Sequence, residues 1–98
     1  MLIEVPYRDG DVISIKLASG EEMVARLDKE TTDTLVLSKP TMLIATDGGM
    51  GMAPFMFTSS MDSKYTMRLN GVICIVKTED ETAKMYSEKT SGIMLASA

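Results

Sequence analysis

Arg68 and Asn70 are the side chains with the widest scope for molecular recognition in this chain, and Gly71 follows them directly. The amide of Asn70 can both donate and accept a hydrogen bond at the edge of a nucleobase. The guanidinium of Arg68 can attract a phosphate or stack on a base. Asn-Gly is also a favoured pair for a tight hairpin turn, so a purely structural role for Asn70 and Gly71 stays open.

The sequence contains few residues of the types that usually carry out catalysis. The chain has no histidine and a single cysteine, Cys74, which removes most hydrolytic and zinc chemistry. Cys74 lies within the apolar run 73–76 and is expected to be a buried small hydrophobe. Carboxylates such as Glu21 and Glu22 are most simply solvated turn residues. We therefore expect a protein that is not an enzyme and needs no cofactor.

Methionine is unusually frequent, with ten residues, and Met50, Met52 and Met56 lie in or beside a glycine-rich segment. Thioethers are ligands for copper(I). Without histidine, however, a flexible methionine-rich surface more often packs against a partner. We expect no metal site.

Length and charge narrow the class of protein further. A chain of 98 residues fits one domain, and its net charge of −4 argues against wrapping duplex DNA by charge alone. The first ten residues lack the basic start and apolar run of a signal peptide. No segment approaches the ~18 apolar residues of a membrane helix. A soluble, cytoplasmic protein is expected, and a lone cysteine fits a reducing compartment.

Period-two alternation of apolar residues predicts three strands in the first half of the chain. The first lies around 12–17 and the second around 23–28, with Ser19-Gly20 as the turn between them. The third begins at Thr34 and is able to extend past Pro40 to about residue 44, because proline is tolerated at a strand edge or bulge.

The second half alternates irregular segments with strands. Glycines and Pro54 in residues 47–54 predict a loop. Residues 55–57 are predicted to start another strand, followed by an irregular connection over 58–64 and a strand over 65–69. The Asn70-Gly71 pair predicts a hairpin turn into a strand over 72–76, which is apolar on both faces and is therefore expected to be covered on both sides.

The tail changes to a helical pattern. Thr78 and Glu81 match a capping box, acids occupy the first turn, and Gly92 is a plausible stop. A helix is expected over about 79–91. Because its apolar stripe is thin, we expect residues 1–78 to fold as a barrel domain without the helix and tail of 79–98.

This order of strands and turns resembles the Sm and Sm-like family over about residues 11–77. Residues 12–37, with Gly20 at the turn, resemble the family's first motif, and Leu69-Asn70-Gly71-Val72-Ile73 resembles its second. The resemblance implies an all-β, five-stranded Sm-like (SH3-like) open barrel, here with a C-terminal helix.

Several positions depart from the family pattern. Ala25 replaces the glycine of the second strand, and Asn70 replaces the arginine of the second motif. The aromatic or histidine that stacks on RNA bases has no counterpart, and Thr34 stands near the expected asparagine. The resemblance thus supports the barrel and its assembly more than uridine binding.

The resemblance implies assembly through the last strand, which in Sm-like rings pairs with the edge of the next subunit. Val72, Ile73, Ile75 and Val76 would form this contact, and closure of one repeated contact would give a ring of about five to seven subunits. The alternative is a central strand of a monomeric sheet.

In such a ring, the loop after the second strand and the Asn-Gly turn would meet around a central pore. This places Asp33, Thr34, Arg68, Asn70 and Gly71 together, and repetition of Arg68 would create a band of positive charge on an acidic protein. The implied function is a non-catalytic, ring-forming module that binds single-stranded nucleic acid, RNA more readily than DNA. The alternative is a structural or adaptor ring that binds another protein, for example in a phage or microbial assembly.

Overall fold

The computed structural model describes residues 6–96, with side chains up to residue 91. The elements follow in the order β1 (Val12–Leu17), β2 (Glu22–Glu30), β3 (Thr34–Thr46), β4 (Gly49–Pro54), β5 (Lys64–Arg68), the 3₁₀ turn η1 (Leu69–Gly71), β6 (Val72–Lys77) and α1 (Asp80–Ala96). The class is as predicted, a β-protein with a C-terminal helix, although the strands number six rather than five.

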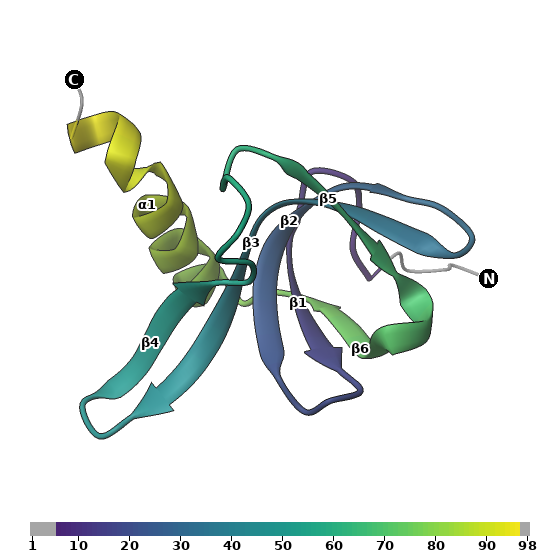
Figure 1. Cartoon of the computed structure of the whole chain (residues 1–98), viewed down its shortest axis with the longest axis horizontal. Helices are drawn as coiled ribbons and strands as arrows, with labels where there is room; N and C mark the ends of the chain where they lie inside the picture. Colours follow the sequence, from purple (N-terminus) through teal and green to yellow (C-terminus); the bar gives the residue numbers. More distant parts are fainter. Residues whose placement is uncertain (1–5, 97–98) are drawn as a thin grey trace.

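All strand pairs are antiparallel, in the order β4-β3-β2-β1-β6, with β5 also paired to β3. The long β3 holds two partners: β5 pairs with residues 34–38 and β4 with residues 41–46. The sheet curls into a barrel, and the β3–β4 hairpin projects away from it (Figure 1). Within the described residues β5 and β6 do not pair with each other, so the barrel is open.

A bulge lets β3 change direction in mid-strand. Ser38 pairs with Arg26 and Thr41 with Val24, so Lys39 and Pro40 together oppose one residue of β2. Lys39 has a φ of 50°, the one positive φ outside glycine in the part of the chain that the structure describes. Bulges of this kind usually place glycine at that position. The predicted continuation of the strand past Pro40 is confirmed.

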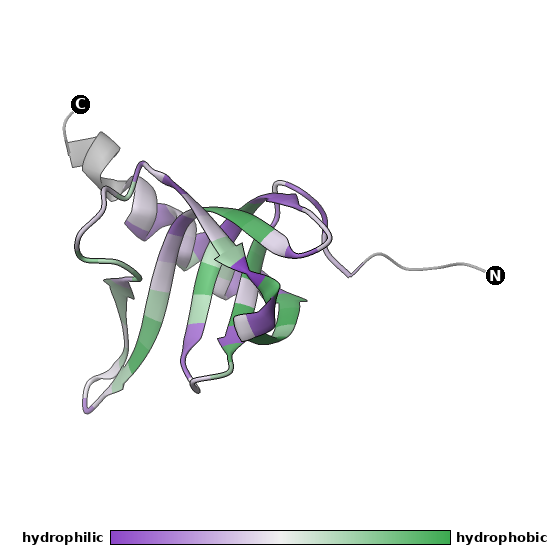
Figure 2. Cartoon of the chain, turned by 45° about the vertical axis from the view of Figure 1, so that its right-hand side comes forward, coloured by the Kyte–Doolittle hydropathy of each residue, from purple (hydrophilic) through white to green (hydrophobic). Residues whose placement is uncertain are grey.

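Two apolar clusters lie on opposite faces of the sheet. The barrel core consists of inward-facing residues of β1, β2 and β3, namely Ile13, Ile15, Met23, Ala25, Leu27, Leu35 and Leu37. On the outer face, Val12 and Val24 pack with Tyr86 of α1. Figure 2 shows hydrophobic bands on the strands and a mostly polar α1.

Tyr86 is the main anchor of the helix, with 1% of its surface exposed. Its Oη donates hydrogen bonds to the backbone carbonyls of Lys39 at 2.7 Å and Ser38 at 3.2 Å. The predicted helix is confirmed, but it runs through Gly92 to Ala96. It begins at Asp80, so Thr78 is not its cap, and the Thr78 hydroxyl instead shares a 2.8 Å hydrogen bond with Ser14.

The loop predicted over residues 47–54 is wrong, because Gly49–Pro54 forms β4. The extension of β3 to Thr46 offers an open edge, and β4 pairs with it from Thr46–Gly49 to Thr41–Pro54. Glycine weakens a strand but does not prevent backbone hydrogen bonds, and Pro54 lies at the end of the strand, where a missing N–H is tolerated.

The strand predicted over residues 55–57 is also wrong. The N–H of Phe55 still donates to the carbonyl of Pro40 at 3.1 Å, but the chain then leaves the sheet and forms bends. Phe55 packs against the barrel core, but Phe57, two residues on, is 84% exposed, so the segment lacks the continuous buried face that would hold it in a strand.

Asn70-Gly71 does not form the predicted hairpin turn. The pair belongs to η1, which carries the chain from β5, on the β3 side of the barrel, to β6, on the β1 side. The expected coverage of β6 on both faces is wrong as well, since Ile73, Cys74 and Val76 are exposed in the single chain. Cys74 is therefore not the buried hydrophobe that the sequence suggested.

Candidate nucleic-acid interface

In the turn between β2 and β3, hydrogen bonds of Thr31 hold Asp33 and Thr34 in place. The N–H of Thr31 donates to the carbonyl of Thr34 at 2.9 Å, and the N–H of Thr34 donates to Oγ1 of Thr31 at 3.1 Å. The same hydroxyl donates to a carboxylate oxygen of Asp33 at 3.3 Å. The turn is thus fixed by its own hydrogen bonds, and Asp33 is exposed at its tip.

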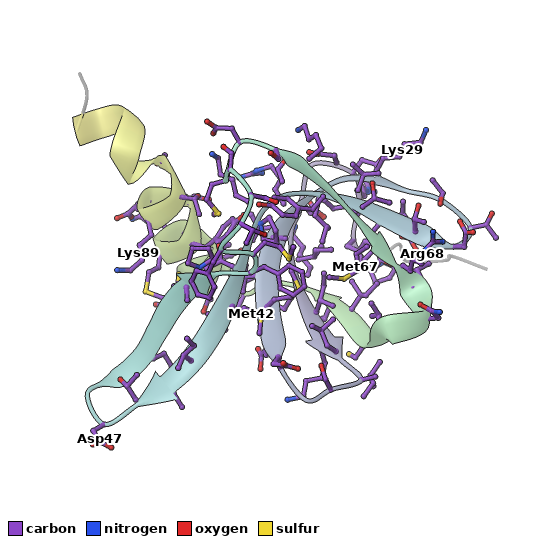
Figure 3. The ribbon with its side chains drawn as sticks, in the orientation of Figure 1. Lys29, Met42, Asp47, Met67, Arg68 and Lys89 are labelled. Atoms are coloured by element: carbon purple, nitrogen blue, oxygen red, sulfur yellow. The ribbon has the colours of Figure 1, made fainter. Side chains whose placement is uncertain are left out.

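Strand β5 brings Arg68 to this turn. Arg68 is the register partner of Thr34, and the next N–H, of Leu69, donates to the carbonyl of Asp33 at 2.9 Å. Residues 34 and 36 positions apart in sequence are therefore neighbours. Arg68 is exposed, and Figure 3 places it at the end of the molecule remote from α1.

The 3₁₀ turn η1 presents Asn70 and Gly71 beside Arg68 and is held at both ends. At one end, the N–H of Leu69 donates a hydrogen bond to the carbonyl of Asp33. At the other end, the carbonyl of Gly71 accepts a 2.9 Å hydrogen bond from the N–H of Ala18, next to the β1–β2 turn. The backbone of η1 is thus fixed while the side chain of Asn70 is exposed. The five residues predicted as a binding site do lie together in the structure.

Their chemistry suits recognition rather than catalysis. The surface offers a guanidinium, a carboxylate, an amide and a hydroxyl, which together can contact a phosphate, a sugar and a base edge. In the part of the chain that the structure describes, no group of three His, Cys, Asp or Glu side chains is arranged to hold a metal ion. Nor do the described residues include a helix long and apolar enough to cross a membrane.

The four residues predicted for the oligomer contact divide between two environments. Val72 and Ile75 pack against the barrel core. Ile73 and Val76 are 67% and 52% exposed. Because β6 pairs only with β1 and β5 only with β3, each leaves one backbone edge open among the described residues. Open edges with apolar side chains favour strand-to-strand association.

A set of charged residues near α1 was not indicated by the sequence. Nζ of Lys64 lies 2.8 Å from Oδ2 of Asp28, and the hydroxyl of Ser38 donates to the same oxygen at 2.6 Å. Partial burial opposes ionisation of Asp28, but these two hydrogen bonds and the positive charges of Lys64 and Arg26 together outweigh it and lower its pKa. The three residues come from β5, β2 and β3, and no spacing along the chain relates them.

Comparison with known proteins identifies solved structures that share this fold. No protein-family model matches the chain, and no curated protein matches it by sequence. Solved structures do match it. A heptameric archaeal Sm protein aligns over 72% of this chain and 90% of its own, with a TM-score of 0.50 and 16% identity. The P. aerophilum SmAP1 heptamer aligns over 74% of this chain and 84% of its own, with the same TM-score and identity.

The chain therefore has an Sm-like fold: an open, antiparallel β-barrel, here with a C-terminal helix. The resemblance noted in the sequence is confirmed at the level of the fold. At 16% identity the match concerns the architecture alone.

Proposed function

We propose that the protein assembles into a closed ring of identical subunits and binds single-stranded nucleic acid, RNA in preference to DNA, without catalysis. The hydrogen bond from the Leu69 N–H to the Asp33 carbonyl carries the proposal, because it joins the two segments that hold Asp33, Thr34, Arg68, Asn70 and Gly71. Side chains that could contact phosphate, sugar and base thus share one exposed surface.

The open edges of β5 and β6 support the ring. One subunit can add its β6 to the β5 edge of the next, which would satisfy both backbone edges and cover Ile73 and Val76. The contact is heterologous, so it must close after a fixed number of subunits, about five to seven, to avoid a filament. Rotational symmetry would repeat Arg68 and Asp33 together, so that every subunit offers one guanidinium for phosphate beside one carboxylate.

A protein-binding adaptor ring is the second candidate, and the β3–β4 hairpin favours it. The hairpin projects from the barrel and exposes Ile44 by 46% and Met50 by 62% (Figure 1). Exposed apolar residues on a projecting arm are typical of surfaces that contact other proteins.

Two measurements test the proposal. Light scattering should give the mass of a ring, and a monomer at micromolar concentration would contradict it. Fluorescence anisotropy should show that a labelled single-stranded oligouridine binds more tightly than a duplex of equal length, because bases must be unstacked to be read. A ring that binds no oligonucleotide at low salt would favour the adaptor.

A further inference from the structure

A groove runs between α1 and the β-sheet, on the side of the barrel where β5 begins at Lys64 and away from its Arg68 end. It consists of two adjoining hollows of about 460 and 410 Å³, which share Lys39 and Thr90 in their walls. Each volume lies within the range of small-molecule sites. Figure 3 shows Lys89 on α1 near the base of β4, far from Arg68.

The groove carries a charge opposite to that of the whole chain. Its walls hold four of the ten basic residues (Arg26, Lys39, Lys64 and Lys89) and two of the fourteen acidic ones (Asp28 and Asp62). The charged residues of the groove therefore have a positive sum, although the chain has a net charge of −4. A phosphate would therefore be attracted to this groove in spite of the net negative charge of the chain.

The cations are available to a ligand. Lys39 pairs with Asp62 at 3.3 Å, but the Asp62 side chain is 89% exposed, and exposed pairs are weak enough to exchange partners. Lys89 has no ion pair among the described residues. Lys39 and Lys89 line the same hollow, one from β3 and the other from α1. A phosphate between them could contact both.

The other wall of this hollow is apolar. Met52, Ala53 and Pro54 of β4 and Met61 of the following segment line it, with hydroxyl groups from Thr41 and Thr90 nearby. Thioethers pack favourably on aromatic rings, so this wall suits a nucleobase better than a carboxylate-rich peptide. The hydroxyls could bond to a sugar.

The backbone at Lys39 adds an independent observation. Its φ of 50° lies in the left-handed region, where any residue but glycine is strained, and lysine nevertheless occupies this bulge. Strain that persists at a groove-lining cation indicates that the side chain has a use there.

We propose that this groove binds one nucleoside phosphate unit, with the phosphate between Lys39 and Lys89 and the base against Met52 and Met61. The proposal rests on the proposed function for the source of the ligand, a nucleotide of a bound single strand. The same chemistry would also accept a free mononucleotide.

The test compares Lys89→Ala with Lys84→Ala, which removes the same charge from an exposed site on the same helix outside the groove. Binding of a fluorescein-labelled 15-nucleotide oligouridine is measured by anisotropy over a range of salt. Lys89→Ala should weaken binding at least about threefold and lower the slope of log K against log salt by about 0.7, the value for one phosphate contact with a single strand. Lys84→Ala should change neither.

Lys39→Gly separates binding from folding. Glycine removes the charge but relieves the positive φ, so the free energy of unfolding should not fall. Affinity for the oligonucleotide should fall about as much as in Lys89→Ala. A variant that keeps full stability and full affinity would overturn the role of Lys39.

A titration with UMP, followed by amide NMR shifts, locates the site directly. Shifts are expected at Met52, Ala53 and Thr90. If oligouridine does not bind but UMP gives these shifts, the proposed function fails while the groove stands as a site for a free nucleotide. If oligouridine binds, Lys89→Ala behaves like Lys84→Ala and UMP shifts other residues, the groove proposal is overturned. It is equally overturned if neither probe binds.

Discussion

The phenol oxygen of Tyr86 donates a 2.7 Å hydrogen bond to the backbone carbonyl of Lys39, 47 residues earlier in the chain. This bond fastens α1 to the bulge of β3, the point at which the strand turns from its β5 partner towards its β4 partner. Helix, barrel and projecting hairpin therefore meet at one backbone carbonyl.

Tyr86→Phe should lower the free energy of unfolding by about 1–2 kcal/mol, because it keeps the ring but removes the hydroxyl that donates to two partly buried carbonyls. Urea unfolding followed by circular dichroism measures this. Tyr65→Phe is the control, since the Tyr65 hydroxyl donates to the Ser60 carbonyl in an exposed hydrogen bond. Equal losses in the two variants would contradict a special role for Tyr86.

Alkaline pH should destabilise the protein through the same residue. Burial raises the pKa of Tyr86 from its usual 10.0 to about 12. Above pH 10 the unfolded chain therefore loses the tyrosine proton while the folded chain keeps it. The stabilisation is complete below pH 10 and is lost as the pH rises to about 12, by an amount on the order of 2–3 kcal/mol.

Tyr86→Phe provides the comparison for this pH dependence, because lysines also titrate in the same range. The free energy of unfolding of wild type minus that of Tyr86→Phe should fall from about 1–2 kcal/mol at pH 9 and change sign before about pH 12. A constant difference would show that the Tyr86 proton is not linked to folding.

Truncation after Thr78 tests whether residues 1–78 form a domain by themselves. The barrel core lies on the face of the sheet opposite α1, so a β-type circular dichroism spectrum should remain. Loss of Tyr86 leaves Val12 and Val24 exposed, and removal of a large buried aromatic costs about 3–5 kcal/mol. The truncated chain should thus melt well below the full chain. An unfolded spectrum would mean that helix and barrel share one cooperative core.

The strands of the barrel could be predicted because their signal is local. Apolar residues at every second position in β1, β2 and the first half of β3 leave one face to bury, and Gly20, with a φ of 105°, supplies the turn. The Sm-like fold was inferred from the resemblance of residues 12–37 and 69–73 to the two motifs of that family, and the solved structures confirm it.

Asp47-Gly48 and Asn70-Gly71 show where local signals fail. Asp47-Gly48 connects β3 to β4 in a tight hairpin, although the flanking glycines suggest a loop. Asn70-Gly71, with the stronger apparent signal, makes a 3₁₀ turn because its flanking strands belong to different edges of the barrel. The pairing of the strands depends on the arrangement of the whole sheet and not on the turn residues alone.

Of the two candidate binding surfaces, one could be found from the sequence and the other could not. Arg68 and Asn70 were identifiable from their chemistry and from the family motif, and a backbone hydrogen bond joins their segment to Asp33. The groove was not identifiable, because Lys39, Asp62 and Lys89 come together only through the bulge and the packing of the helix.

Ile73→Asp and Ile75→Asp should separate assembly from folding, since the two residues lie on the same strand in different environments. Ile73 is 67% exposed beside the open edge, so aspartate there should leave the subunit folded and reduce the ring to monomers. Ile75 packs against the barrel core, where a buried carboxylate should unfold the subunit. Light scattering and circular dichroism distinguish these results. A folded ring with Ile73→Asp would exclude β6 as the subunit contact.

Arg68→Ala and Asn70→Ala should affect nucleic-acid binding differently, because their side chains contact different parts of a nucleotide. Arg68 can contact phosphate, so its loss should weaken binding to every sequence and flatten the salt dependence. Asn70 can both donate to and accept from a base edge, so its loss should change base preference more than overall affinity. Because the stacking aromatic or histidine of the family has no counterpart in this sequence, wild-type affinity is expected to be on the order of micromolar. Anisotropy with labelled oligouridine, oligoadenine and oligocytidine measures both effects. Lys84→Ala is the control, and variants of Arg68 and Asn70 that bind all three oligonucleotides like Lys84→Ala would show that this surface is not the binding site.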